Sequence, residues 1–159
     1  MTNIIIASEY DSIMMENKLQ MILRSLDKDF IIWLNQQIIN EDPSSTFGLV
    51  NPDNIDGAIY SAIFDLEENH SISRSLAVLI HHIAFGHPFA DGNKRTSYAL
   101  LLSIHSKLCE KNILLDTKLA KKLAITIAEM SGESEDEEKD IVKLQKIIEE
   151  IISTYSPYT

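Results

Sequence analysis

Apolar residues recur at helical spacing along most of the chain. Within each predicted segment they return every three or four positions, which places them on one face of an α-helix. The segments are residues 12–26, 28–38, 54–66, 73–85, 93–109, 119–130 and 141–151. Five glycines and four prolines leave few breaks along the chain. The pattern predicts an all-α fold.

Residues that commonly cap helices mark several boundaries of these segments. The expected N-caps are Asp27, Asp53 or Asn54, and Ser71 or Ser73. Gly86 lies where a left-handed C-terminal cap is expected. The run Ile4–Ile6 is short and β-branched, which favours a strand, although such a strand has no predicted partner. Residues 41–52, which include proline, serine and glycine, form the longest predicted loop.

Composition and charge narrow the classes of partner. With 14 basic and 24 acidic side chains the net charge is −10, which repels nucleic acid and anionic membranes. A single cysteine excludes an internal disulfide framework and cysteine-rich metal sites. No apolar run approaches the ~20 residues of a bilayer span, and no basic leader marks a signal peptide. We therefore expect a cytoplasmic protein whose partners are neither nucleic acids nor membranes.

The segment from His87 to Thr96 carries the candidate chemistry. Lys94 and Arg95 lie in the first turn of a predicted helix, where they oppose the partial positive charge of the helix dipole. Two cations become favourable there once an anion docks on the free backbone N–H groups of the same turn. Gly92, just before that helix, lets the backbone approach a bulky ligand closely. The pattern favours an anion site over a neutral loop.

Further residues of this loop supply the other parts that phosphate transfer needs. Asp91 suits Mg²⁺, which proteins commonly hold by one or two carboxylates together with substrate phosphates. The His87 imidazole can accept a proton near neutral pH. Phe89 is interpreted as the apolar anchor of the loop. The segment thus combines an anion cradle, a metal carboxylate, two cations and a base.

The nine residues HPFADGNKR at positions 87–95 resemble the signature loop of the Fic/Doc (Fido) family. That signature reads HPFx[D/E]GN[G/K]R, and every constrained position matches. The resemblance implies an all-α, Fido-type helical bundle with a short flap near the active loop. A small β-hairpin is one form that such a flap can take. It also implies a transferase that uses ATP and Mg²⁺ to modify a Ser, Thr or Tyr hydroxyl of a target protein.

Carried over by position, the resemblance assigns a role to individual loop residues. His87 would deprotonate the target hydroxyl, Asp91 would hold Mg²⁺, and Phe89 would anchor the loop. The phosphate-binding residues would be Gly92, Asn93, Lys94 and Arg95. Residues 41–52 fall where the family has the flap that aligns the target segment.

Two positions bear on the subclass. Adenylyl-transferring members usually have Gly at the place of Lys94 and a second Arg at the place of Tyr98. Both departures resemble Doc (death-on-curing) toxins, which transfer the terminal phosphate of ATP to a translation elongation factor and are restrained by an antitoxin. Doc-like phosphoryl transfer is therefore the first hypothesis. AMP transfer by a Fic-type adenylyltransferase is the alternative, and a non-catalytic Fido scaffold is a further alternative.

The sequence SIMMEN near the N-terminus resembles the inhibitory helix motif [S/T]xxxE[G/N] of self-regulated Fic enzymes. The resemblance names Ser12 and Glu16 as inhibitory residues. Because Tyr98 replaces the Arg with which that Glu usually pairs, Glu16 would have to reach Arg95 or Lys94 instead. The competing interpretation is a solvent-facing Glu on an ordinary helix.

This motif also suggests how the chain is organised. Residues 1–40 are expected to form an N-terminal helical extension, with inhibition as its candidate role. Residues 41–159 are expected to form the Fic/Doc core domain.

Several other residues are expected to be structural. His105 lies on an apolar stripe, which predicts a buried, hydrogen-bonded imidazole. Trp33 and Tyr60 are expected in the core as well. His81 and His82 lack a third matched ligand in the sequence, so no zinc site is expected there.

Overall fold

The computed structural model describes residues 2–155, with side chains from residue 11 onward. The helices are α1 (Thr2–Ser25), α2 (Lys28–Asn40), α3 (Asp53–Asn69), α4 (Ile72–Phe85), α5 (Asn93–Cys109), α6 (Thr117–Glu129) and α7 (Glu137–Thr154), with a 3-10 turn η1 (Ser134–Asp136) before α7. Within these residues the β pairing found is one isolated bridge. The all-α prediction is therefore confirmed.

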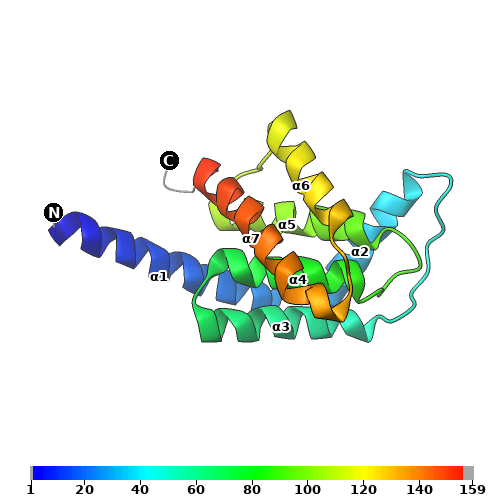
Figure 1. The fold of residues 1–159 in the computed structure, drawn as a ribbon, viewed down its shortest axis with the longest axis horizontal. Coiled ribbons are helices and arrows are strands. Elements are labelled where there is room, and N and C mark those ends of the chain that lie inside the picture. Colours follow the sequence, from blue (N-terminus) through cyan, green and yellow to red (C-terminus); the bar gives the residue numbers. More distant parts are fainter. Residues whose placement is uncertain (1, 156–159) are drawn as a thin grey trace.

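Helix α4 lies at the centre of the bundle, between α3, α5 and α7 (Figure 1). Its apolar residues are not confined to one face, and most of its side chains from Ser73 to Ala84 are buried. A helix that is apolar all round is stable only when other helices cover every side of it. The neighbouring helices therefore fix the position of α4. The chain passes directly from its last residue, Phe85, into the loop between α4 and α5.

Two predicted N-caps are confirmed. The Asp27 carboxylate accepts a hydrogen bond from the backbone N–H of Asp29 at 2.9 Å, at the start of α2. The Ser71 hydroxyl accepts one from the backbone N–H of Arg74 at 3.2 Å, at the start of α4. Each satisfies an N–H group that the first turn of a helix leaves without a partner.

The expected caps around Gly86 and α3 are wrong. Gly86 has a right-handed φ of −76°, and the left-handed residue is the next one, His87, with φ 47°. Helix α3 begins after Pro52 without a side-chain cap, because the Asn54 side chain donates to the carbonyl oxygen of Gly86 at 2.5 Å instead. Gly86 is still required for space, since a Cβ there would lie 2.6 Å from the His82 carbonyl oxygen.

The strand expected at Ile4–Ile6 is also wrong, because these residues continue α1 toward the N-terminus. β-Branched residues have only slightly lower helix propensity than others, so a short run does not prevent a helix. In Figure 1, α1 projects from the end of the bundle opposite the loop between α2 and α3.

Burial confirms one of the structural assignments and overturns two. His105 is 2% exposed, and its ring nitrogen Nε2 lies 3.1 Å from the carbonyl oxygen of Tyr155. Trp33 and Tyr60, expected in the core, are 50% and 69% exposed. Both residues lie on helices whose buried positions are filled mostly by aliphatic residues.

The single cysteine, Cys109, is buried at the end of α5. Its thiol donates a hydrogen bond to the carbonyl oxygen of Tyr155 at 3.0 Å. Burial raises the pKa of this thiol. Because the thiolate is the reactive form, Cys109 is a structural residue.

The boundary expected after residue 40 falls at the end of α2. Leu19 and Leu23 of α1, and Ile31 and Leu34 of α2, belong to the same hydrophobic cluster as the helices that follow. Of the helices in residues 2–155, none combines the length and apolar character that crossing a bilayer requires.

Two glycines are expected to respond oppositely to alanine substitution. Gly132 has φ +76°, and an added Cβ would lie 2.5 Å from the Phe85 ring. Gly132→Ala should therefore lower the free energy of unfolding by at least about 1–2 kcal/mol, the cost of a left-handed backbone alone. Gly57 lies within α3 with open space around it, so Gly57→Ala should raise that free energy by about 0.5–1 kcal/mol. Urea unfolding of both variants tests the pair, and a Gly132→Ala chain as stable as the parent would contradict the expectation.

Candidate active site

The loop between α4 and α5 lies against the loop between α2 and α3, at one end of the bundle (Figure 1). The backbone N–H of Ala90 donates to the Gly48 carbonyl oxygen at 2.8 Å, and that of Val50 donates to the Pro88 carbonyl oxygen at 2.9 Å. An isolated antiparallel bridge joins Leu49 to Phe89. Residues 41–52 therefore pair with the candidate loop and form no β-hairpin of their own. The β-hairpin form of the flap, one of the sequence expectations, is wrong.

Phe89 anchors the loop in the core. Its side chain is 1% exposed and is among the largest of the fully buried side chains. The Asn93 side chain accepts a hydrogen bond from the Phe89 N–H at 3.1 Å and donates one to the Phe89 carbonyl oxygen at 2.9 Å. The Asn93 amide thus braces the loop backbone, and what Asn93 can offer to an anion is its backbone at the helix start.

A second brace, absent from the sequence prediction, comes from α2. The Asn35 side chain is fully buried and donates to the Asp91 carbonyl oxygen at 2.9 Å and to the Thr96 hydroxyl at 3.1 Å. Gly92 has φ +77°, and an added Cβ would lie 3.1 Å from both Asn35 and Ile39. Glycine is therefore required here both for the left-handed backbone and for the close approach of α2.

Removing this brace is expected to loosen the loop. Asn35→Ala removes the donor from the Asp91 carbonyl oxygen and from the buried Thr96 hydroxyl, so it should lower the free energy of unfolding by about 1–3 kcal/mol. The exposed neighbour Gln37 provides the matched control, Gln37→Ala, which should change stability by less than about 0.5 kcal/mol. Thermal unfolding measures both, and equal stability of the two variants would remove Asn35 from the architecture of the site.

Arg95 is held by residues on both sides of the site. Its guanidinium lies 3.0 Å from the Asp42 carboxylate, 3.1 Å from the Ser45 hydroxyl and 3.5 Å from the Asp91 carboxylate. Asp42 also accepts hydrogen bonds from the hydroxyl and N–H groups of Ser44, at 2.6 Å and 3.0 Å. These Ser44 bonds and the Ser45 hydroxyl hold the pKa of Asp42 well below its usual range. Arg95 is thus a partly exposed cation paired with an ionised carboxylate of the flap.

Lys94 points away from Arg95. Its ammonium group donates to the Ala128 carbonyl oxygen at 3.2 Å and lies 5.3 Å from the centre of the Phe85 ring. Ala128 is in the last turn of α6, where the helix dipole favours a positive charge. The unfavourable position of Lys94 at the start of α5 is therefore offset by the end of another helix.

Asp91 and His87 are both exposed on the loop. The Ser45 hydroxyl, and then the N–H of Gly92, lower the pKa of Asp91, so its carboxylate is ionised near neutral pH. The His87 carbonyl oxygen accepts from the Asn51 side chain at 3.3 Å, which ties the base of the loop to the flap. An exposed, ionised carboxylate beside the start of a helix fits the oxygen ligands that Mg²⁺ prefers.

Ser12 and Glu16 lie elsewhere. The Glu16 carboxylate pairs with the His70 ring at 2.6 Å, and His70 directly follows the C-terminal end of α3. The candidate loop adjoins the opposite, N-terminal end of α3, through Asn54. In this arrangement Glu16 makes no contact with Arg95, and Asp42 takes that place.

A cavity of about 510 Å³ opens beside Arg95. Its wall includes Asp42, Tyr98 and aliphatic parts of α2 and α5. Tyr98 is half-buried here, and burial raises the pKa of its hydroxyl. The candidate site therefore has a hollow next to its cation, large enough for a small ligand.

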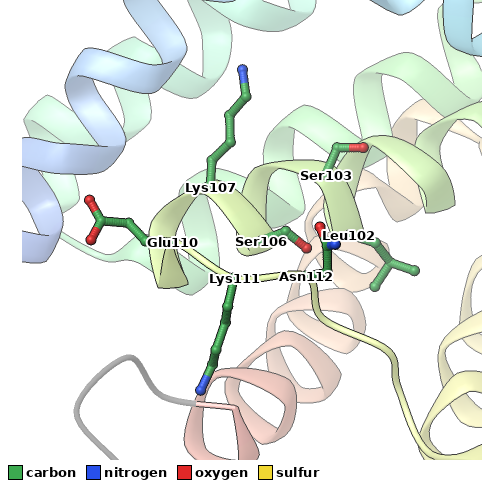
Figure 2. Close-up of a pocket in the computed structure, with 7 residues that line it drawn as sticks. All are labelled: Leu102, Ser103, Ser106, Lys107, Glu110, Lys111 and Asn112. Carbon is green, nitrogen blue, oxygen red and sulfur yellow. The ribbon is translucent and has the colours of Figure 1, made fainter.

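A wider depression, of about 630 Å³, lies at the far end of α5 (Figure 2). Lys107, Glu110 and Lys111 line it, and in Figure 2 their side chains point in different directions. A binding site needs polar groups that converge on one ligand. The depression therefore lacks the arrangement that the loop at the other end of α5 has.

The comparisons with known proteins agree with the loop geometry. The model of the Fic/DOC family matches residues 25–105, which is just over half of the chain. The matched stretch runs from the last residue of α1 to the last turn or so of α5 and includes the braced loop together with Asn35 and the flap. No curated protein and no solved structure matches the chain. On the family match and the loop it contains, the chain belongs to the Fic/DOC family.

Proposed function

We propose that this protein transfers a phosphoryl group from ATP to a hydroxyl side chain of a target protein. Fic/DOC members generally modify proteins with part of a nucleotide. The observation that carries the proposal is the loop itself, in which Gly92 leads into the first turn of α5, with the Asp91 carboxylate before that turn and the Arg95 guanidinium within it. Such a helix start binds phosphate through its N–H groups, and the neighbouring cation neutralises developing charge.

In the proposed reaction each loop residue has one task. His87 accepts the proton of the target hydroxyl as that oxygen forms a bond to the γ-phosphorus, and the bond from that phosphorus to the β-phosphate oxygen breaks, which releases ADP. Arg95 stabilises the charge on the transferred group. Asp91 would hold Mg²⁺, which supplies charge neutralisation on the phosphates when bound. Phe89 and Asn93 keep the loop backbone in place.

AMP transfer is the second candidate. In that reaction the target oxygen bonds to the α-phosphorus, and pyrophosphate leaves. Phosphoryl transfer is preferred because Lys94 and Tyr98 stand where adenylyl-transferring members usually have Gly and Arg. Lys94 adds a side chain to the first turn that glycine would lack, although its ammonium group lies at Ala128 of α6, and Tyr98 provides no second guanidinium beside the Arg95 cavity. The third candidate, a scaffold without activity, is disfavoured by the intact His87.

One experiment separates these candidates. The protein is incubated with a cell lysate and ATP labelled at either the α- or the γ-position. A band labelled from the γ-position that appears with the parent, and is absent with His87→Ala and with lysate alone, supports phosphoryl transfer, because kinases of the lysate label the same proteins in all three samples. A band labelled from the α-position with the same dependence identifies AMP transfer. Absence of any band that depends on the parent, in lysates from several sources and with Mg²⁺ present, would support the scaffold.

We further propose that the target presents a Ser, Thr or Tyr hydroxyl beside the flap, with a translation factor as the first protein to test. A toxin restrained by a small antitoxin follows from the same Doc-like subclass. Restraint by residues 1–40 belongs to the AMP-transfer alternative. It requires Glu16 to leave its ion pair with His70 and to reach Arg95 or Lys94.

The Asp42–Arg95 pair leads to a further prediction. Nucleotide phosphate must compete with Asp42 for the guanidinium, so Asp42→Asn should strengthen ATP binding by up to about fivefold, the range of an exposed ion pair. The asparagine oxygen can still accept from the Ser44 N–H, which keeps the flap in place. Calorimetric titration with ATP and Mg²⁺ measures the change. Weaker binding in Asp42→Asn would mean that Asp42 assists the nucleotide.

A further inference from the structure

A second group of side chains, at the junction of α4 and α7, has no part in the proposed transfer. His81 and His82 lie near the C-terminal end of α4, and Glu137 is the first residue of α7. One potential ligand atom from each of these residues lies within 4.8 Å of the other two. The third ligand is distant from the two histidines in the sequence, because Glu137 is brought to them only by the packing of α7 on α4.

The ring of His81 is oriented by a buried carboxylate. Its nitrogen Nε2 lies 3.3 Å from an oxygen of Asp140, which is 2% exposed. Asp140 also accepts hydrogen bonds from the N–H groups of Ser131 and Gly132, at 3.2 Å and 3.1 Å. Because an ionised carboxylate only accepts, this contact places the His81 proton on Nε2 and leaves a lone pair on Nδ1.

The ring of His82 is oriented in the same way by the backbone. Its Nδ1 donates to the Val78 carbonyl oxygen at 2.8 Å, which leaves a lone pair on Nε2. That Nε2 lies 3.5 Å from a Glu137 oxygen, and the Nδ1 of His81 lies 4.0 Å from the same oxygen. With neutral rings, three acceptor atoms face one another and no hydrogen lies between them. A bound cation would accept the lone pairs of all three atoms.

The chemistry fits zinc, and the spacing is near what zinc needs. With bonds of about 2.0–2.1 Å, ligand atoms of a tetrahedral zinc ion lie about 3.3 Å apart. The two histidine nitrogens lie 3.5 Å and 4.0 Å from the Glu137 oxygen and within 4.8 Å of each other, so side-chain rotation must bring the three atoms closer together. Two histidines and one glutamate are a known donor set for zinc with one open position. Metal-binding histidines also commonly donate their other N–H to a carboxylate or a carbonyl oxygen, as both do here. A cavity of about 240 Å³, lined also by Phe85 and Gly132, adjoins the three ligands.

We propose that His81, His82 and Glu137 bind one divalent transition metal ion, Zn²⁺ in the first instance, with its fourth position open to this cavity. The ion would join the end of α4, directly before the candidate loop, to the start of α7. The Phe85 ring lies 4.9 Å from the His81 ring, and the Lys94 ammonium group lies 5.3 Å from the centre of the same Phe85 ring. The Phe85 ring therefore lies between His81, a ligand of the proposed ion, and Lys94 of the candidate loop. The proposal does not depend on which phosphorus the protein transfers, or on whether it transfers any.

Calorimetric titration of the full chain with Zn²⁺, after treatment with a chelator, tests the proposal. We expect one equivalent to bind, and we expect Glu137→Gln and His82→Ala each to weaken binding at least about 100-fold. The Glu137 side chain is 47% exposed, so Glu137→Gln should fold normally. His70→Ala is the matched control, because His70 also faces a carboxylate, Glu16, but in a two-residue pair. It should bind Zn²⁺ as the parent does.

Two further measurements keep the outcome decisive. Thermal unfolding should shift upward with Zn²⁺ in the parent and in His70→Ala, and should not shift in Glu137→Gln, since an ion that binds the folded chain stabilises it. The His87→Ala variant should keep the site, which separates it from adventitious binding at the active loop. The proposal is overturned if the parent binds no Zn²⁺, or if Glu137→Gln and His82→Ala bind it as tightly as the parent.

Discussion

Replacing His87 by alanine is expected to slow target modification by about 10²–10⁴-fold, the usual contribution of a general base. The imidazole is exposed at the start of the loop, so its loss removes no core contact. Labelled-ATP transfer to the target, measured under single-turnover conditions, gives the rate, and binding of ATP should change little. The variant should therefore lose rate in the chemical step and keep the parent's affinity for ATP.

His70→Ala is a matched control for this variant. His70 and His87 are both exposed histidines with a left-handed backbone, with φ values of 55° and 47°. Any general effect of placing alanine at such a position is therefore common to both variants. Transfer by His87→Ala at the rate of His70→Ala would show that the proton leaves by another route.

Replacing Arg95 by alanine is expected to lower the transfer rate by at least about 10³-fold, as for other arginines that stabilise a transferring phosphoryl group. Here the loss should include nucleotide affinity, because the guanidinium lies beside the cavity that would hold the phosphates. Arg95→Lys keeps the charge but not the two-nitrogen geometry, and it should recover only part of the rate.

Arg24→Ala is the control for charge. Arg24 forms an ion pair with Glu67 between α1 and α3, so its removal also takes one cation from an acidic protein. The measurement compares the rate and the calorimetric affinity for ATP in all three variants. Equal losses for Arg24→Ala and Arg95→Ala would point to a long-range effect of net charge and would argue against a direct contact with phosphate.

The helices and two of their caps could be predicted because their causes are local. The apolar spacing in α5 and the side-chain caps Asp27 and Ser71 depend on residues within a turn or two. The candidate loop was found for the same reason, since the residues from His87 to Arg95 are contiguous in the sequence.

What could not be predicted depends on packing between distant elements. Asn35 and Asp42 lie in or after α2, far from the loop in sequence, and nothing in their own surroundings indicates a partner there. The side chain of Lys94 likewise finds a carbonyl oxygen of α6. Trp33 shows the converse, because hydrophobic character does not determine which side of a helix the core will cover.

The protected thiol of Cys109 has a practical consequence for watching the flap move. Since its sulfur is buried and hydrogen-bonded, maleimide dyes should not react with Cys109, and the residue need not be mutated before labelling. A cysteine introduced at the exposed position of Thr46 would then be the sole labelled site. The fluorophore would report, in real time, how the flap responds as nucleotide arrives.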